Sequence, residues 1–291
     1  MMFAYLVFVM KKFSNFDLGY VHLAVLLFGL AGLFGKWIVL PATIIVLGRV
    51  FFASLFLGPI LFAKNQRVFL SGKEYNKFIV LGAILSVHWV SFFYSIQIST
   101  VAVGLLSFSS FPIFTTFLEP KILGGKLPLK SVFLSLLTFC GLVLVVPEFN
   151  LENNVTQGVL WGVLSGLTFA LLSILNKKYV ANYTSAEVAF HQDVNAFIFL
   201  IPFLLIEEVN WSLDAIILLA ILGVVFTAVA HTLFIEGMKT VRATTASIIA
   251  SLEPVYGILF AMVFFTEYPS IEQVFGGVII LGTSLYSSLR S

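Results

Sequence analysis

Residues 213–236 read LDAIILLAILGVVFTAVAHTLFIE, and this stretch decides the class of the fold. Its two fully charged residues, Asp214 and Glu236, lie at its ends. As an α-helix, a run of this length spans about 36 Å, which is enough to cross a bilayer core of about 30 Å. The stretch is therefore predicted to be a membrane-spanning helix.

Similar apolar runs fill the rest of the chain. Of its 291 residues, 60% are hydrophobic and 10% are charged, whereas a soluble domain has about 25% charged residues. Too few polar residues remain to cover the surface of a soluble protein. We predict an all-α integral membrane protein of ten transmembrane helices, at residues 20–40, 43–63, 78–98, 101–121, 129–147, 156–176, 186–206, 213–236, 243–264 and 271–289.

The basic residues predict how these spans are oriented. Fourteen of the sixteen Lys and Arg residues fall in alternate loops or at the termini, on one predicted side. The other side carries acidic residues such as Glu148, Glu207 and Glu267. Because Lys and Arg accumulate in cytoplasmic loops, we predict a multi-pass plasma (inner) membrane protein with both termini in the cytoplasm. The basic residues on that side are Lys11, Lys12, Lys64, Arg67, Lys73, Lys77, Lys121, Lys126, Lys130, Lys177, Lys178, Lys239, Arg242 and Arg290.

The two halves of the chain, residues 1–150 and 151–291, resemble each other. Phe111-Pro112 in the fourth span corresponds to Glu253-Pro254 in the ninth, and Phe28-Gly29-Leu30 corresponds to Ser165-Gly166-Leu167. Because each half has five spans, the second half enters the membrane in the opposite sense to the first. Inverted repeats of this kind are typical of secondary transporters, which bind substrate near the midplane between the repeats.

Residues 246–254, ASIIASLEP, followed by residues 266–270, TEYPS, resemble the EamA branch of the drug/metabolite transporter superfamily. The resemblance covers nearly the whole chain, although Phe111 stands where a glutamate would precede the proline. It implies a carrier, most often an exporter, of small metabolites such as amino acids, with a central cavity lined by both halves.

The prolines of the fourth and ninth spans predict breaks in the helices. Pro112 and Pro254 each lack the N–H that continues a helix, and Pro254 frees the carbonyl of Ala250. Glu253 lies beside the second break, inside the membrane. Ionisable groups at that depth usually face a cavity or one another, so Glu253 is a candidate proton carrier. A structural role as a permanently protonated brace is the alternative.

The third span carries a polar stripe that begins at His88. His88, Ser91 and Ser95 recur at helical spacing, and a polar stripe in lipid must face protein or a cavity. The candidate substrate-binding or proton-binding residues here are His88, Trp89, Tyr94 and Gln97. Packing within the bundle is the alternative for Trp89.

The seventh span holds the densest polar cluster. His191, Gln192 and Asn195 are candidates for substrate or proton handling, because residues three or four apart share a helix face. Asp193 points elsewhere, toward Lys177 or Lys178. No ligand spacing predicts a metal site, and no cofactor is expected.

Two cations lie inside spans. For both Lys36 and Arg49, one interpretation is a residue that extends to the headgroups. Arg49 lies deeper, where it suits a substrate carboxylate or a partner such as Glu253. His231 and Glu236 of the eighth span are interpreted as gate or interface groups.

Together these features predict a secondary transporter, with a small-molecule substrate and the lipid bilayer as its partners. Proton coupling by Glu253 or a histidine is one hypothesis, and facilitative uniport by the same fold is its alternative. A membrane-embedded enzyme is the rival class, but the chain has no HExxH or GxSxG motif. The basic residues form no nucleic-acid-binding patch, and the fold permits a homodimer.

Overall fold

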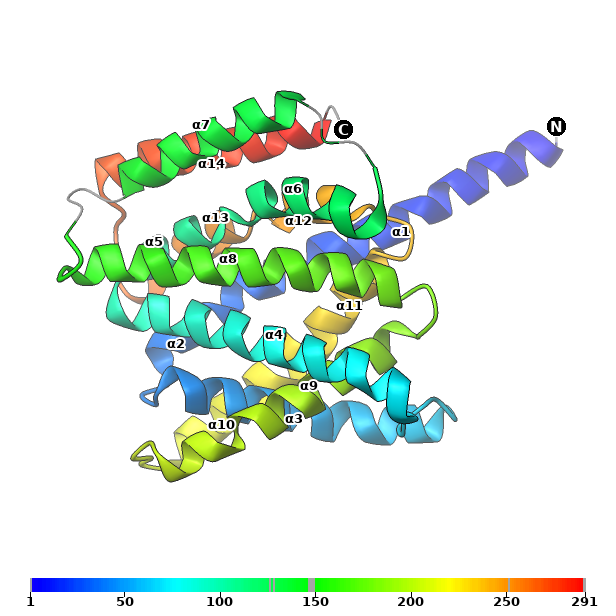
Figure 1. Cartoon of the computed structure of the whole chain (residues 1–291), viewed down its shortest axis with the longest axis horizontal. Coiled ribbons are helices and arrows are strands. Elements are labelled where there is room, and N and C mark those ends of the chain that lie inside the picture. Colours follow the sequence, from blue (N-terminus) through cyan, green and yellow to red (C-terminus); the bar gives the residue numbers. More distant parts are fainter. Residues whose placement is uncertain (1, 126, 128, 146–149, 251, 290–291) are drawn as a thin grey trace.

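A computed structural model describes residues 2–125, 127, 129–145, 150–250 and 252–289. Most of these residues lie in helices, and there is no strand among them. The predicted loop residues Lys126, Glu148 and Arg290 lie outside these described residues. The helices are α1 (Met2–Ala31), α2 (Phe34–Trp37), α3 (Ala42–Ala63), α4 (Gly72–Ile98), α5 (Val101–Phe108), α6 (Phe111–Leu123), α7 (Leu129–Val145), α8 (Asn154–Tyr179), α9 (Ser185–Leu200), η1 (Ile201–Leu205), α10 (Leu213–Gly223), η2 (Val224–Val229), α11 (Ala230–Gly237), α12 (Ala243–Ala250), α13 (Glu253–Phe264) and α14 (Ile271–Leu289) (Figure 1).

The chain is a multi-pass membrane protein. In the described part, seven segments are long and apolar enough to cross a bilayer, and they match the first four and the sixth to eighth predicted spans within a few residues. The fifth, ninth and tenth predicted spans correspond to shorter apolar helices, Val132–Val145, Glu253–Phe264 and Ile271–Thr283. The count of ten spans therefore stays a prediction.

Several spans are broken helices. In the fourth span, α5 ends at Phe108 and α6 begins at Phe111, one residue before Pro112. In the ninth, α12 ends at Ala250 and α13 begins at Glu253, one residue before Pro254. Ser107 and Ser109 donate to the carbonyls of Val103 and Leu105, one turn back on their own helix. Both predicted proline positions thus coincide with helix breaks.

The two halves of the chain interdigitate. The most extensive helix contacts join α4 to α8, α7 to α14, α4 to α9, α3 to α9 and α1 to α11. All five contacts pair an element of the first half with one of the second, as Figure 1 shows for α8 lying beside α4 and for α14 beside α7.

Two glycines bring a helix of one half against the proline break of the other. A Cβ on Gly29 would lie 2.9 Å from the Glu253 carbonyl oxygen, and a Cβ on Gly166 would lie 2.7 Å from the Phe108 carbonyl oxygen. Gly29 and Gly166 correspond in the sequence repeat, and so do the two breaks that they contact. The opposite orientation of the two repeats stays a prediction, and this correspondence fits it.

Replacing Gly166 with alanine is expected to lower the free energy of unfolding by about 1–3 kcal/mol, because the added methyl group would push two backbones apart. Gly282→Ala is the matched control, since a Cβ there meets nothing within 4 Å and alanine raises helix propensity. Thermal unfolding of the purified variants measures both effects. Equal stability of the two variants would contradict this packing.

Candidate functional site

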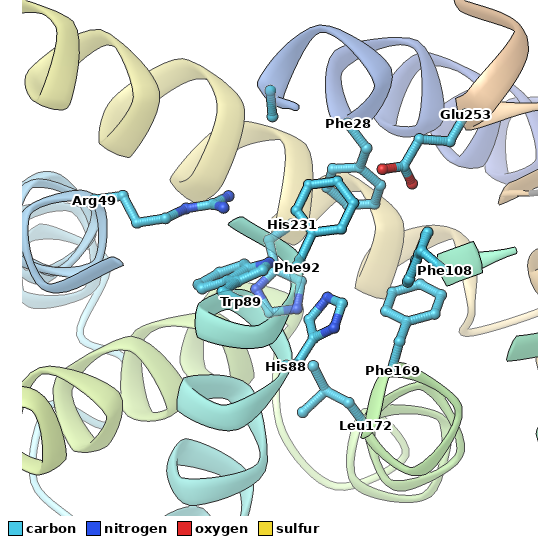
Figure 2. A pocket seen from close by; sticks show the side chains of 11 residues that line it. Phe28, Arg49, His88, Trp89, Phe92, Phe108, Phe169, Leu172, His231 and Glu253 are labelled. Atoms are coloured by element: carbon cyan, nitrogen blue, oxygen red, sulfur yellow. The ribbon is translucent and has the colours of Figure 1, made fainter. Parts of the chain in front are cut away.

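A cavity lies at the centre of the bundle, where helices of both halves meet (Figure 2). Its volume is about 30 Å³, which suffices for a water molecule or two, whereas sites for small molecules measure roughly 300–1,000 Å³. In this state the cavity is therefore too small for a metabolite. Its lining residues are Phe28, Ala31, Arg49, His88, Trp89, Phe92, Phe108, Phe169, Leu172, His231 and Glu253.

Arg49 enters the cavity from α3 and is held there by two elements. Its guanidinium carbon lies 3.8 Å from the centre of the Trp89 ring, a cation–π contact that is strong when desolvated. Its Nε donates to Thr227 Oγ1 at 2.9 Å, and Thr227 in turn donates to the carbonyl of Leu222. Thr227 belongs to the π-helix η2, a wide turn that often marks functional sites.

Glu253 reaches the cavity from the opposite side. It is the first residue of α13, immediately after the break that Pro254 enforces, and 4% of it is exposed. In Figure 2 its carboxyl group and the Arg49 guanidinium point inward from opposite sides, with aromatic rings between them. No ion pair joins Arg49 to Glu253 in the described residues. The cavity thus presents one cationic and one acidic group on separate walls.

Two histidines complete the polar lining. His88 Nδ1 lies 2.9 Å from Ser165 Oγ and 3.1 Å from the Ser165 carbonyl, which fixes the ring among Phe92, Phe108 and Phe169. His231 packs edge-on against Trp89 at 5.6 Å. His231 thus lies in the cavity lining, where it contacts a residue of the first half, and its interpretation as a gate or interface group stays a prediction. One sequence signal could have placed His231 near the cavity. It lies four residues after Thr227, the residue that holds Arg49, and residues four apart share a helix face.

Of the other predicted residues of α4, Tyr94 and Gln97 lie away from the cavity. Tyr94 is 39% exposed and packs against Trp161, whereas Gln97 donates its amide to the Leu40 carbonyl at 2.8 Å. The polar stripe turns toward α8: Ser95 donates to the Gly158 carbonyl at 2.6 Å. Only His88 of the stripe lines the cavity.

The polar cluster of α9 also lies outside the cavity lining. His191 Nε2 bonds to the Arg67 carbonyl at 2.8 Å, and Gln192 donates to Asn176 on α8 at 2.7 Å. Asn195 donates to the carbonyl of His191, one turn back. These contacts tie α9 to its neighbours.

Asp193 forms no hydrogen bond or ion pair with Lys177 or Lys178 among the described residues, which corrects the prediction. Lys177 Nζ instead donates to the carbonyls of Met238, Lys239 and Val241 at the end of α11, and these satisfy its three N–H groups. Asp193 is completely buried, and its charge acts on Arg49.

Polar contacts join the helices at both ends of the bundle. At one end Lys36 Nζ donates to the Ser99 carbonyl at 2.9 Å and lies 3.9 Å from Glu267, which accepts from the Val101 N–H. Lys36 thus bonds protein rather than extending to the headgroups.

At the other end Glu187 accepts from the Arg67 N–H at 2.8 Å, and the Tyr183 hydroxyl donates to Glu74 at 2.9 Å. Burial raises the pKa of this hydroxyl, and its bond to Glu74 raises it further. Within the described residues no three His, Cys, Asp or Glu side chains gather as a metal site would require.

The chain is similar to known transporters in sequence and to a solved structure in fold. The EamA-like transporter family matches residues 17–146 and, a second time, residues 156–289. The chain is 26% identical to the uncharacterized transporter YxxF of Bacillus subtilis (strain 168), over 92% of this chain and 88% of that protein. A solved structure has the same fold, with a TM-score of 0.71 and 16% sequence identity. The match covers 95% of this chain and 98% of the chain in that structure.

Two further relatives carry names that state a substrate. The S-adenosylmethionine uptake transporter of Rickettsia felis is 25% identical, over 82% of this chain and 80% of that protein. The pseudopaline exporter CntI of Pseudomonas aeruginosa (strain UCBPP-PA14) is 26% identical, over 83% of this chain and 84% of that protein.

Proposed function

Because the chain belongs to the EamA-like transporter family, we propose that it is a ten-span secondary carrier that moves a small zwitterionic metabolite, such as an amino acid, by alternating access. In this proposal residues 1–150 and 151–291 form two inverted repeats in the plasma membrane, with both termini in the cytoplasm. The substrate site is the central cavity.

The observation that carries the proposal is the placement of Arg49 and Glu253 on opposite walls of one buried cavity. A guanidinium suits a carboxylate through two parallel hydrogen bonds, and a carboxylate beside aromatic faces suits an ammonium or sulfonium group. A substrate that carries both groups satisfies both walls at once. S-adenosylmethionine, named for one relative, is an amino acid with an additional sulfonium.

The small volume of the cavity supports alternating access. It is too small for an amino acid in this state, and polar contacts join the helices at both ends of the bundle. Substrate entry therefore requires one end to separate. The Lys36–Glu267–Ser99 contacts and the Arg67–Glu187 and Tyr183–Glu74 contacts are the groups that would part in turn.

We propose that transport runs out of the cell, because the chain resembles exporters of small metabolites. Relatives named for uptake and for export both occur, so the fold serves either direction. Proton coupling is part of the proposal, and facilitative uniport is the alternative. Flux that is indifferent to a pH gradient for every substrate would favour the uniporter.

The test is a binding screen of the purified protein against amino acids, with L-methionine, its des-amino acid and its decarboxylated amine as a matched set. We expect only compounds with both groups to stabilise the protein, by about 2.7 kcal/mol at one hundred times the Kd. Equal stabilisation by the amine or the acid alone would contradict a zwitterion site. Counterflow in proteoliposomes then confirms transport of each hit.

A further inference from the structure

Three ionisable side chains are buried together in the middle of the bundle. Arg49 is 2% exposed, Asp193 is 0% exposed and Glu253 is 4% exposed. The charges of both carboxyl groups act on Arg49, and that of Asp193 acts more strongly. Asp193 lies outside the cavity lining, so it acts on the site through Arg49.

Asp193 is otherwise unpartnered. Neither of its carboxyl oxygens has a hydrogen-bond partner among the described residues, while Arg49 is turned toward Trp89 and Thr227. A buried carboxylate with no partner is costly and takes up a proton instead. Two buried carboxyl groups therefore depend on a single guanidinium for charge compensation.

The neighbouring elements supply no second compensating charge. Arg49 comes from α3, and Arg49 is the one charged group acting on Asp193 in the described residues. His88 of α4 and His231 of α11 face the same cavity as Arg49. Asn176 of α8, which accepts from Gln192 beside Asp193, is neutral and compensates no charge. The three groups are electrically neutral when exactly one carboxyl group is protonated.

We propose that Asp193 and Glu253 share one proton in the empty site, and that a substrate with a net positive charge displaces this proton. The proposal rests on the proposed function, in which Glu253 receives the cationic group and Arg49 the carboxylate. A neutral zwitterion leaves the charge balance unchanged, so the proton moves from Glu253 to Asp193. A substrate of charge +1 requires both carboxylates, so the proton leaves to water on the side from which the substrate entered.

The consequence is that substrate charge sets the coupling. The carrier exchanges a proton for each singly cationic substrate and moves zwitterions without proton flux. Asp193 is then the residue that makes proton exchange available, because without it Arg49 and Glu253 already balance each other.

The shared proton is tested without any substrate, by the infrared C=O stretch of protonated carboxylic acids in the lipid-embedded protein at neutral pH. We expect one buried protonated carboxyl group in the unmodified protein, none in Asp193→Asn or Glu253→Gln, and two in Arg49→Met. Glu187→Gln is the matched control, since Glu187 is a buried carboxyl group outside the cavity that accepts two backbone N–H bonds, and its replacement should leave the band unchanged. A band that persists unchanged in both Asp193→Asn and Glu253→Gln would overturn the proposal.

Coupling is tested by calorimetric titration in buffers of different ionisation enthalpy, which counts protons released on binding. L-methionine and S-methyl-L-methionine are nearly isosteric probes of charge 0 and +1. In the unmodified protein we expect proton release with S-methylmethionine and none with methionine. In Asp193→Asn we expect no proton release with either probe. S-methylmethionine should also bind this variant about tenfold more weakly, or worse, because one buried charge lacks a partner. A thermal unfolding midpoint close to that of the unmodified protein shows that Asp193→Asn is folded.

These outcomes separate the two proposals. If the infrared result holds but neither probe nor any other amino acid binds, the zwitterion site is wrong and the shared proton stands. If both probes bind and S-methylmethionine releases no proton, or releases it equally in Asp193→Asn, the coupling through Asp193 is wrong and the proposed function stands.

Discussion

Replacing Arg49 with alanine is expected to weaken binding of a zwitterionic substrate by about 30-fold or more, because truncating one member of a buried charge pair costs roughly 2–5 kcal/mol. The substrate carboxylate would lose its guanidinium partner in a cavity from which water is nearly excluded. Calorimetric titration with L-methionine, or with the strongest ligand of the binding screen, measures the loss.

Two variants make the Arg49 result specific. Arg49→Lys keeps the charge but loses the planar pair of donors and the stacking on Trp89, so it is expected to recover only part of the affinity. Lys64→Ala removes a cation from the exposed end of the same helix and should leave binding unchanged. An Arg49→Ala protein that is folded and binds as tightly as Lys64→Ala would contradict the assignment.

Replacing Glu253 with glutamine is expected to reduce the preference for amino acids over their des-amino analogues by about tenfold or more, because the cationic group then lacks a charged partner. The isosteric amide keeps the volume of the side chain beside Pro254. Affinities for methionine and its des-amino acid, measured in both proteins, form a cycle that isolates this contact from general destabilisation.

The control for Glu253 is Glu208→Gln, which removes an exposed carboxylate after η1. We expect it to leave the preference for the amino group intact. If Glu253→Gln weakened binding of methionine and of the des-amino acid by the same factor, Glu253 would be a structural brace of the broken helix and not a ligand group.

Much of the fold follows from the sequence because the bilayer imposes a simple length rule. Seven predicted spans have helices of the required length and hydropathy, and the breaks at Pro112 and Pro254 follow from the missing N–H groups. The π-helix around Thr227 and the break between α1 and α2 do not follow, because apolar composition is silent about a local change of hydrogen-bond register.

The candidate site was predictable only in part. Arg49, His88, Trp89 and Glu253 are both predicted and placed at the cavity, since charged or aromatic groups deep in a span must face something other than lipid. Hydropathy does not fix the rotation of a helix, however. Neutral polar groups such as Gln97 and Asn195 are satisfied equally well by backbone carbonyls of their neighbours.

The aromatic walls of the cavity were beyond sequence reasoning for a different reason. The chain has 32 Phe residues, so nothing distinguishes Phe108 or Phe169 from the many that pack between helices or face lipid. Asp193 was misplaced because a single helix gives the spacing of its residues but not the identity of the helix that each one meets.

Alternating access through the cavity is tested most directly with the variant Ala31→Cys, at a small lining residue, in a protein whose one native cysteine is removed by Cys140→Ala. Membrane-impermeant thiol reagents are applied to sealed vesicles from either side. The account predicts labelling from both sides, slowed in each case by a saturating bound substrate. Labelling that occurs from one side only, under every condition of substrate and pH, would contradict it.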